Sequence, residues 1–104
     1  MTNSTELRGR VAVIPGAGRP LGRAIAELFG SRGASLVVPI IDDWPHSNNE
    51  MKAEFELAGY DFLLVPCDLR DPIQTKKLVD EIDARYGAMH YLINNIERGG
   101  MPVV

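Results

Sequence analysis

Four short runs of consecutive apolar residues, separated by helix-length segments, constrain the fold of this chain more than any other feature. The runs occupy residues 11–14, 35–41, 61–66 and 89–94. Because their apolar residues are continuous rather than alternating, we expect strands that are buried on both faces, as in a parallel sheet. The whole pattern predicts the order β-α-β-α-β-α-β.

The three intervening segments carry apolar residues at helical spacing, and each is followed by a glycine that can end a helix. They occupy residues 21–32, 48–58 and 71–86. Asp71 is expected to cap the last helix, with Pro72 at its first position. The residues expected to face the sheet are Leu21, Ala24, Ile25, Leu28, Met51, Phe55, Ala58, Thr75, Val79, Ile82 and Tyr86.

Right-handed crossovers then limit the topology. Three strands wind outward with two helices on one face, and the third helix returns over the other face to bring the fourth strand beside the first. The prediction is a three-layer, Rossmann-like α/β half-domain with a parallel sheet in the order 3-2-1-4 and three helices. We expect residues 1–104 to form this single domain, with a ligand crevice where strands one and four diverge.

Composition and charge exclude several classes of function. A net charge of −3 and a pI near 5.3 argue against a nucleic-acid partner. No apolar run approaches the roughly 18 residues of a membrane span, and the polar N-terminus lacks a secretory apolar region. The single cysteine, Cys67, fits a reducing compartment, so a cytoplasmic protein is expected. His46 and His90 have no partners at metal-ligand spacing, which predicts no metal site.

The stretch "IPGAGRPLG", residues 14–22, follows the first apolar run and opens the first helix. Gly16 can make the tight turn, and Gly22 permits close contact between helix and strand. Backbone N–H groups at the helix start would then face a pyrophosphate, aided by the helix dipole. The alternative is an ordinary strand-to-helix turn that has collected glycines.

Three motifs in the same order resemble the N-terminal half of the short-chain dehydrogenase/reductase family. They are "PGAGRPLGRAIAELF", "CDLRD" and "YLINN", and the resemblance covers residues 7–97. It implies an NAD(P)-binding portion of an oxidoreductase, in which Asp68 holds the adenine edge and Leu69 supplies neighbouring backbone. For Asp68, a place in the polar box at the start of the helix remains the alternative. The implied cofactor-binding residues are Gly16, Gly18, Arg19, Leu21, Gly22, Asp42, Asp68, Leu69, Asn94 and Asn95.

The chain departs from the family pattern in both of its nucleotide motifs. Pro15 stands where the family has a threonine, and Pro20 stands where it has a glycine. Proline brings a ring and lacks an N–H, although it is well suited to the first position of a helix. Ile96 and Glu97 replace the alanine and glycine that follow the paired asparagines. We therefore expect the dinucleotide to bind weakly.

The end of the second strand bears on the choice between NAD and NADP. Members that use NAD carry an acidic residue at the position of Ile40, and Asp42 could substitute for it if the loop bends back. Arg19 resembles the basic residue that NADP-using members set against the 2′-phosphate, which favours NADP. A solvated loop arginine is the open alternative for Arg19.

The catalytic signature of the family, Tyr-x-x-x-Lys, is not found in this chain. None of the three tyrosines is followed by lysine at the fourth position. A neighbouring lysine is what brings the tyrosine pKa down from near 10 for acid–base work. The chain is thus expected to have no catalytic residues, either as the cofactor-binding half of a dehydrogenase or as a free-standing binding or assembly module. Its ending, "GGMPVV", favours the first reading.

The fourth strand is expected to lie at an unpaired edge beside a partly bare sheet face. Such an edge is a template for another chain, and a large exposed apolar patch is unusual in monomers. A homodimer or higher homo-oligomer that buries the fourth strand or the open face is therefore predicted, with aggregation as the alternative.

Overall fold

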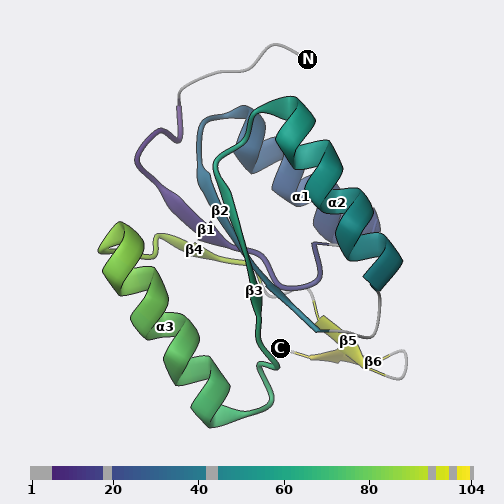
Figure 1. The fold of residues 1–104 in the computed structure, drawn as a ribbon, viewed down its shortest axis with the longest axis vertical. Coiled ribbons are helices and arrows are strands. Elements are labelled where there is room, and N and C mark those ends of the chain that lie inside the picture. Colours follow the sequence, from purple (N-terminus) through teal and green to yellow (C-terminus); the bar gives the residue numbers. More distant parts are fainter. Residues whose placement is uncertain (1–5, 18–19, 42–44, 94–95, 99–100, 104) are drawn as a thin grey trace.

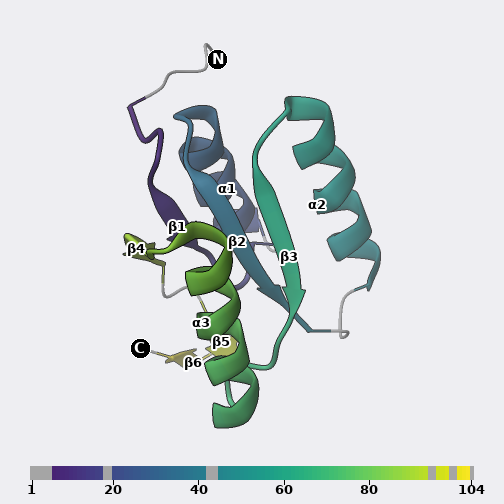
Figure 2. The same ribbon diagram turned by 60° about the vertical axis from the view of Figure 1, so that its left-hand side comes forward.

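The computed structural model describes residues 6–17, 20–41, 45–93, 96–98 and 101–103. Its centre is a four-stranded parallel sheet in the order β3-β2-β1-β4, which confirms the predicted topology (Figure 1). The strands are β1 (Val11–Val13), β2 (Ser35–Ile40), β3 (Phe62–Pro66) and β4 (Tyr91–Leu92). The helices are α1 (Pro20–Ser31), α2 (Pro45–Ala58) and α3 (Pro72–Tyr86). Helices α1 and α2 lie on one side of the sheet and α3 lies on the other, as Figures 1 and 2 both show.

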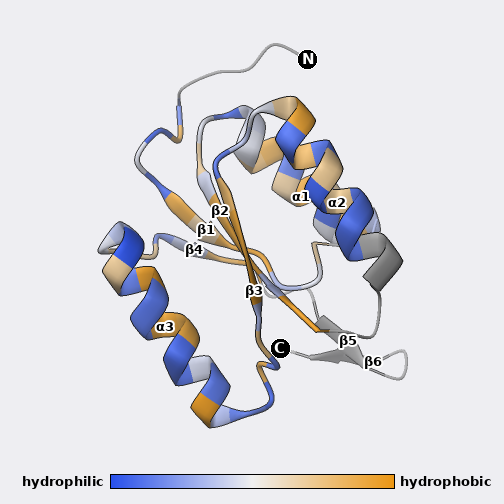
Figure 3. Cartoon of the chain, in the orientation of Figure 1, coloured by the Kyte–Doolittle hydropathy of each residue, from blue (hydrophilic) through white to orange (hydrophobic). Residues whose placement is uncertain are grey.

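Alternate residues of β1, β2 and β3 pack against opposite helical layers, because successive side chains of a strand point to opposite faces. The α1–α2 side holds a buried cluster that includes Ala12, Ile14, Leu36, Val38, Met51 and Phe55. The α3 side holds a second cluster, formed by Val11, Val13, Val37, Val65, Cys67, Leu78 and Ile82. Figure 3 shows mainly hydrophobic strands between helices that carry both hydrophilic and hydrophobic residues. Burial on both faces explains why the apolar runs are continuous.

Helix α1 uses a different face from the predicted one. Leu21 and Leu28 are 66% and 40% exposed, so their assignment to the core was wrong. The buried positions in their place are small, namely Gly22, Ala26 and Gly30. These three residues are spaced four apart, so they form one stripe along the helix. Small side chains let the helix backbone come close to its neighbours, and this is why the larger leucines lie outside the contact.

The predicted α1 residue Ala24 is also exposed, whereas Ile25 packs against the core cluster. In α2, Met51 and Phe55 are fully buried as predicted, while Ala58, the last residue of the helix, is exposed. Ala58 therefore does not belong to the buried face of α2, and its prediction was wrong.

Helix α3 buries Leu78 and Ile82, with Tyr86 packed beside them and Thr75 partly buried. Val79, predicted to face the core, is 52% exposed. Successive helical residues are turned by about 100°, so burying Leu78 places the next side chain on the flank. Spacing alone had not distinguished these neighbouring apolar positions.

A two-stranded antiparallel hairpin follows the parallel sheet. It pairs β5 (Ile96–Arg98) with β6 (Met101–Val103) in a sheet of its own. The sequence pattern did not predict this hairpin, because its strands have only three residues each. It contains the positions of Ile96 and Glu97 that distinguish this chain from the family pattern.

Gly30 supplies a direct test of the close packing of α1. A Cβ atom at this position would lie 2.8 Å from Cγ and Cδ2 of the Tyr60 ring, which itself packs on Phe55 with ring centroids 5.7 Å apart. Gly30→Ala is therefore expected to lower the free energy of unfolding by about 1–3 kcal/mol, the usual cost of overpacking. Urea denaturation measures this, with the exposed Lys52→Ala on α2 as control. A Gly30→Ala protein as stable as the control would contradict the packing described.

Candidate functional site

The carboxyl ends of the parallel strands meet at one edge of the sheet, and backbone hydrogen bonds tie the segments beyond them together. The Ile14 N–H donates to the Val37 carbonyl at 2.9 Å, and the Ile93 N–H donates to the Val13 carbonyl at 3.0 Å. On the other side, the Cys67 N–H donates to the Ile40 carbonyl at 2.9 Å. This edge is where ligands bind in open α/β sheets.

The glycine loop leaves β1 at this edge. Gly16 has φ of +75°, a left-handed conformation that residues with a Cβ rarely adopt, so the predicted tight turn requires glycine here. Ala17 is fully buried in the core on the α1–α2 side and anchors the loop. Pro20 is the first residue of α1, as its fixed φ favours, and Gly22 is buried within the first turn. Helix α1 therefore begins at the carboxyl ends of the strands.

Several of the predicted cofactor residues lie outside the described residues, namely Gly18, Arg19, Asp42, Asn94 and Asn95. Leu21 is exposed in the first turn of α1, where it is available to a ligand rather than to the core. At the end of β2, Ile41 is exposed, and its carbonyl accepts a hydrogen bond of 3.1 Å from the Asn48 side chain of α2. The Asn48 bond thereby attaches Ile41, the residue after β2, to α2.

The segment after β3 contains a dense polar network around Asp68. The Asp68 carboxylate accepts from the Arg70 backbone N–H and from Arg70 Nε, both at 2.9 Å to Oδ1. Arg70 Nη2 donates to Oδ2 at 2.8 Å, which completes a bidentate ion pair. Leu69, between them, is partly buried against the core on the α3 side. Asp68 thus faces Arg70 and does not cap α3.

Asp71 caps α3 as predicted. Its Oδ1 accepts from the Ile73 N–H at 2.9 Å, and its Oδ2 accepts from the Gln74 side-chain amide at 3.0 Å. The Gln74 oxygen in turn accepts from the Asp68 backbone N–H at 2.8 Å. Arg70 and Gln74 were missed in the sequence reading. Their only signal there was the polar spacing of "CDLRDPIQ", which does not say which side chains meet.

The other candidates from the sequence have structural roles. Burial, followed by the nearby Asp68 and Asp71 carboxylates, raises the pKa of the Cys67 thiol, which fits a buried, unreactive cysteine. The exposed His90 accepts a 2.9 Å hydrogen bond at Nδ1 from the Val11 N–H and so joins β4 to β1. Within the part of the chain that the structure describes, no cluster of three or more potential metal ligands occurs. None of the described helices is long and apolar enough to cross a membrane.

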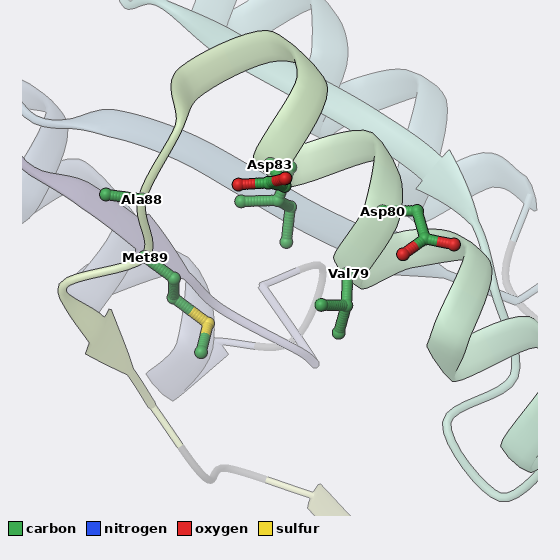
Figure 4. A pocket seen from close by; sticks show the side chains of 6 residues that line it. Val79, Asp80, Asp83, Ala88 and Met89 are labelled. Carbon is green, nitrogen blue, oxygen red and sulfur yellow. The ribbon is translucent and has the colours of Figure 1, made fainter.

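A shallow hollow of about 220 Å³ lies away from this edge, between the second half of α3 and the segment leading to β4. Val79 and Met89 face its open side in Figure 4, with Asp80 and Asp83 at its rim. The hollow does not include any residue of the predicted nucleotide site.

The profile of the short chain dehydrogenase family matches residues 10–101. Versicolorin reductase 1 of Aspergillus parasiticus is 33% identical over 98 residues, an alignment that covers 91% of this chain and 36% of that protein. The chain therefore spans about a third of the length of the curated relatives that it matches.

Solved structures agree with this match. A metagenomic short-chain oxidoreductase in complex with NADP has a TM-score of 0.81 and 32% identity, covering 90% of this chain and 42% of that one. A short chain dehydrogenase/reductase from Burkholderia phymatum in complex with NAD has a TM-score of 0.77 and 34% identity, covering 88% and 32%.

The Asp71 cap predicts a pH dependence of stability. The Ile73 N–H, followed by the Gln74 amide, lowers the pKa of the Asp71 carboxyl below its ordinary value. A lowered carboxyl pKa stabilises the folded chain above the unfolded-state pKa, and that stability is lost as pH falls through the folded-state pKa. Asp71→Asn keeps an acceptor oxygen but cannot titrate. Wild type should therefore exceed Asp71→Asn in stability at pH 7, and this difference should shrink below roughly pH 4.

Urea denaturation from pH 7 to pH 3 measures that difference. Asp80→Asn, on the exposed side of the same helix, controls for removing one carboxylate charge. A gap between wild type and Asp71→Asn that stays constant over the whole range would contradict the role of the ionised cap.

Proposed function

This chain belongs to the short chain dehydrogenase family, and from that premise we propose that it is the NAD(P)-binding portion of an oxidoreductase. The observation that carries the proposal is the left-handed turn at Gly16, which joins β1 to the start of α1 at the carboxyl edge of the sheet. Backbone N–H groups at a helix start are suited to phosphate oxygens. The solved relatives that hold NAD or NADP support a nicotinamide dinucleotide as the ligand class.

In the proposed complex, the pyrophosphate lies against Gly16 and the first turn of α1, and the adenine lies near Asp68 and Leu69. Contacts from Gly18, Arg19, Leu21, Gly22, Asp42, Asn94 and Asn95 complete the set carried over from the family pattern. Arg19 would meet the 2′-phosphate of NADP, and Ile40 at the end of β2 provides no carboxylate for the ribose hydroxyls of NAD. This combination favours NADP over NAD.

We propose weak binding because three residues of this chain are unfavourable for an anionic ligand. Pro20 occupies the first helical position, and proline has no N–H to donate to phosphate. Pro15 is buried beside Gly16 and also lacks this donor. Glu97 adds a carboxylate to a position that the family keeps as glycine. Each change removes attraction for an anionic ligand or adds repulsion.

The chemistry proposed for the whole enzyme is hydride transfer between the dinucleotide and a carbonyl or hydroxyl group. The tyrosine–lysine pair that this chemistry uses in the family is not found in this sequence, so we propose that the chain alone binds cofactor without turnover.

A cytoplasmic location is part of the same proposal and rests on the composition. The alternative proposal is a non-catalytic nucleotide-binding or assembly module that oligomerises.

Calorimetric titration with NADP, NAD and adenosine diphosphate tests the proposed function. Because the adenine and pyrophosphate contacts lie in this chain, the three ligands should bind with affinities within roughly tenfold of one another, about 1.4 kcal/mol. Gly16→Ala should weaken all three by about tenfold, because a Cβ costs the left-handed turn about 1–2 kcal/mol and the free loop relaxes to another conformation, which binding must reverse. Gly87→Ala is a matched control, because Gly87 also has φ of +75° but lies at the end of α3.

Absence of binding by the wild-type chain would refute the proposed function, and so would equal losses in Gly16→Ala and Gly87→Ala. A parallel assay with reduced cofactor and a panel of carbonyl compounds should show no oxidation above background. Sustained turnover by the purified chain would contradict the proposed lack of catalysis.

The proposed homo-oligomer rests on the exposed side of β4 and α3. Strand β4 is at the end of the strand order of its sheet, so one of its edges faces away from β1. Large apolar side chains nearby are 49–69% exposed, namely Ile73, Val79, Met89 and Leu92. We propose that a second copy buries β4 or this open face around a twofold axis.

Light scattering over a concentration series tests the oligomer. Wild type should associate, and Val79→Glu should shift the protein to monomer by placing a charge in the hollow beside α3. Leu57→Glu is the matched control, because Leu57 is 91% exposed on α2, on the opposite side of the sheet. A wild-type chain that stays monomeric at high concentration would overturn the proposal.

A further inference from the structure

Arg70 holds the Asp68 carboxylate through three donors from one residue. The Arg70 backbone N–H and Nε both donate to Oδ1 at 2.9 Å, while Nη2 donates to Oδ2 at 2.8 Å. Because the guanidinium is planar and its donors form a rigid fork, this contact fixes the plane of the carboxylate as well as its position.

Gln74 fixes the backbone of the same residue from the other side. Its side-chain oxygen accepts from the Asp68 N–H at 2.8 Å, and its side-chain nitrogen donates to Asp71 Oδ2 at 3.0 Å. Asp71 is itself held at the start of α3 by the Ile73 N–H. Arg70, which precedes the helix, thereby holds the carboxylate of Asp68, and Gln74 attaches the peptide N–H of Asp68 to the first turn of α3.

The ion pair between Arg70 and Asp68 contributes little to the stability of the fold. The side chains of Arg70 and Asp68 are 57% and 31% exposed, and ion pairs at such positions add little to the free energy of folding. The network is nevertheless placed at the carboxyl edge of the sheet, where the Cys67 N–H joins the end of β3 to the Ile40 carbonyl at the end of β2. Its structural effect is therefore to orient Asp68 at this edge.

A carboxylate that is paired with arginine is better suited to bind a nucleobase than a phosphate group. An unpaired carboxylate would repel an anionic dinucleotide, and the positive charge of Arg70 offsets that repulsion. The oriented carboxylate oxygens remain acceptors, which matches the exocyclic amine of adenine. Hypoxanthine has a carbonyl oxygen at the same place, so a carboxylate there would meet an acceptor.

We propose that Arg70 is a positioning residue that sets the preference of this site for adenine over hypoxanthine, with Gln74 fixing the backbone beneath it. Arg70 acts through Asp68 and not by contact with the phosphates. This inference rests on the proposed function, since it assigns the base end of the same nucleotide site.

The test is calorimetric titration of the whole chain with adenosine diphosphate and inosine diphosphate. Wild type should prefer the adenine nucleotide by about tenfold, the usual effect of one hydrogen bond to a charged group. Arg70→Ala should reduce this preference to about twofold or less. Arg70→Lys should behave similarly, because lysine keeps the charge but lacks the fork. Asp68→Ala should remove the preference as well.

Lys76→Ala is the matched control, since Lys76 pairs with Asp80 on the exposed side of α3 and should leave the preference at its wild-type value. Equal losses of affinity for both nucleotides in Arg70→Ala would mean that Arg70 binds phosphate, which overturns the proposal. A wild-type chain that binds both nucleotides equally overturns it too, while the proposed function stands. A wild-type chain that binds neither nucleotide refutes the proposed function and this inference together.

Discussion

Burial of the parallel sheet on both faces is the constraint on which the rest of this structure depends. The central strands β1 and β2 pack against α1 and α2 on one side and against α3 on the other. Each connection between parallel strands must therefore cross a face of the sheet and return, so every strand ends at the same edge. The glycine turn follows β1 and the Asp68 network follows β3, so both lie at that edge.

The helix positions could be predicted because apolar runs and caps act locally, and the strand order followed from the right-handed crossovers between parallel strands. As their residue types indicate, Asp71 caps the start of α3 with its side chain, and Gly87 ends the helix in a left-handed conformation. The buried face of α1 could not be predicted in the same way. Leucine is more hydrophobic than glycine, but close approach to the Tyr60 ring leaves room at Gly30 only for a hydrogen atom. The buried face of α1 is therefore set by how closely the helix approaches its neighbours, and not by the hydropathy of its residues.

The candidate site was predictable to a lesser degree. Gly16 and Asp68 belong to motifs whose spacing is visible in the sequence, and both lie at the expected edge. Arg70 and Gln74 take part through side-chain geometry across a turn, which no periodicity describes. This chain spans about a third of the length of its curated relatives. What covers the exposed side of β4 is therefore a separate question from which ligand binds at the carboxyl ends of the strands.

The most direct measurement of the central claim is a two-dimensional NMR titration of the isotope-labelled chain with adenosine diphosphate. If the carboxyl edge of the sheet is the nucleotide site, backbone amide signals of Gly16, Leu69 and Ile93 should shift with a common affinity. Signals at the opposite edge, such as those of Gly33 and Gly59, should stay in place. Shifts that cluster at Gly33 and Gly59, or around Val79 and Met89, would contradict the account.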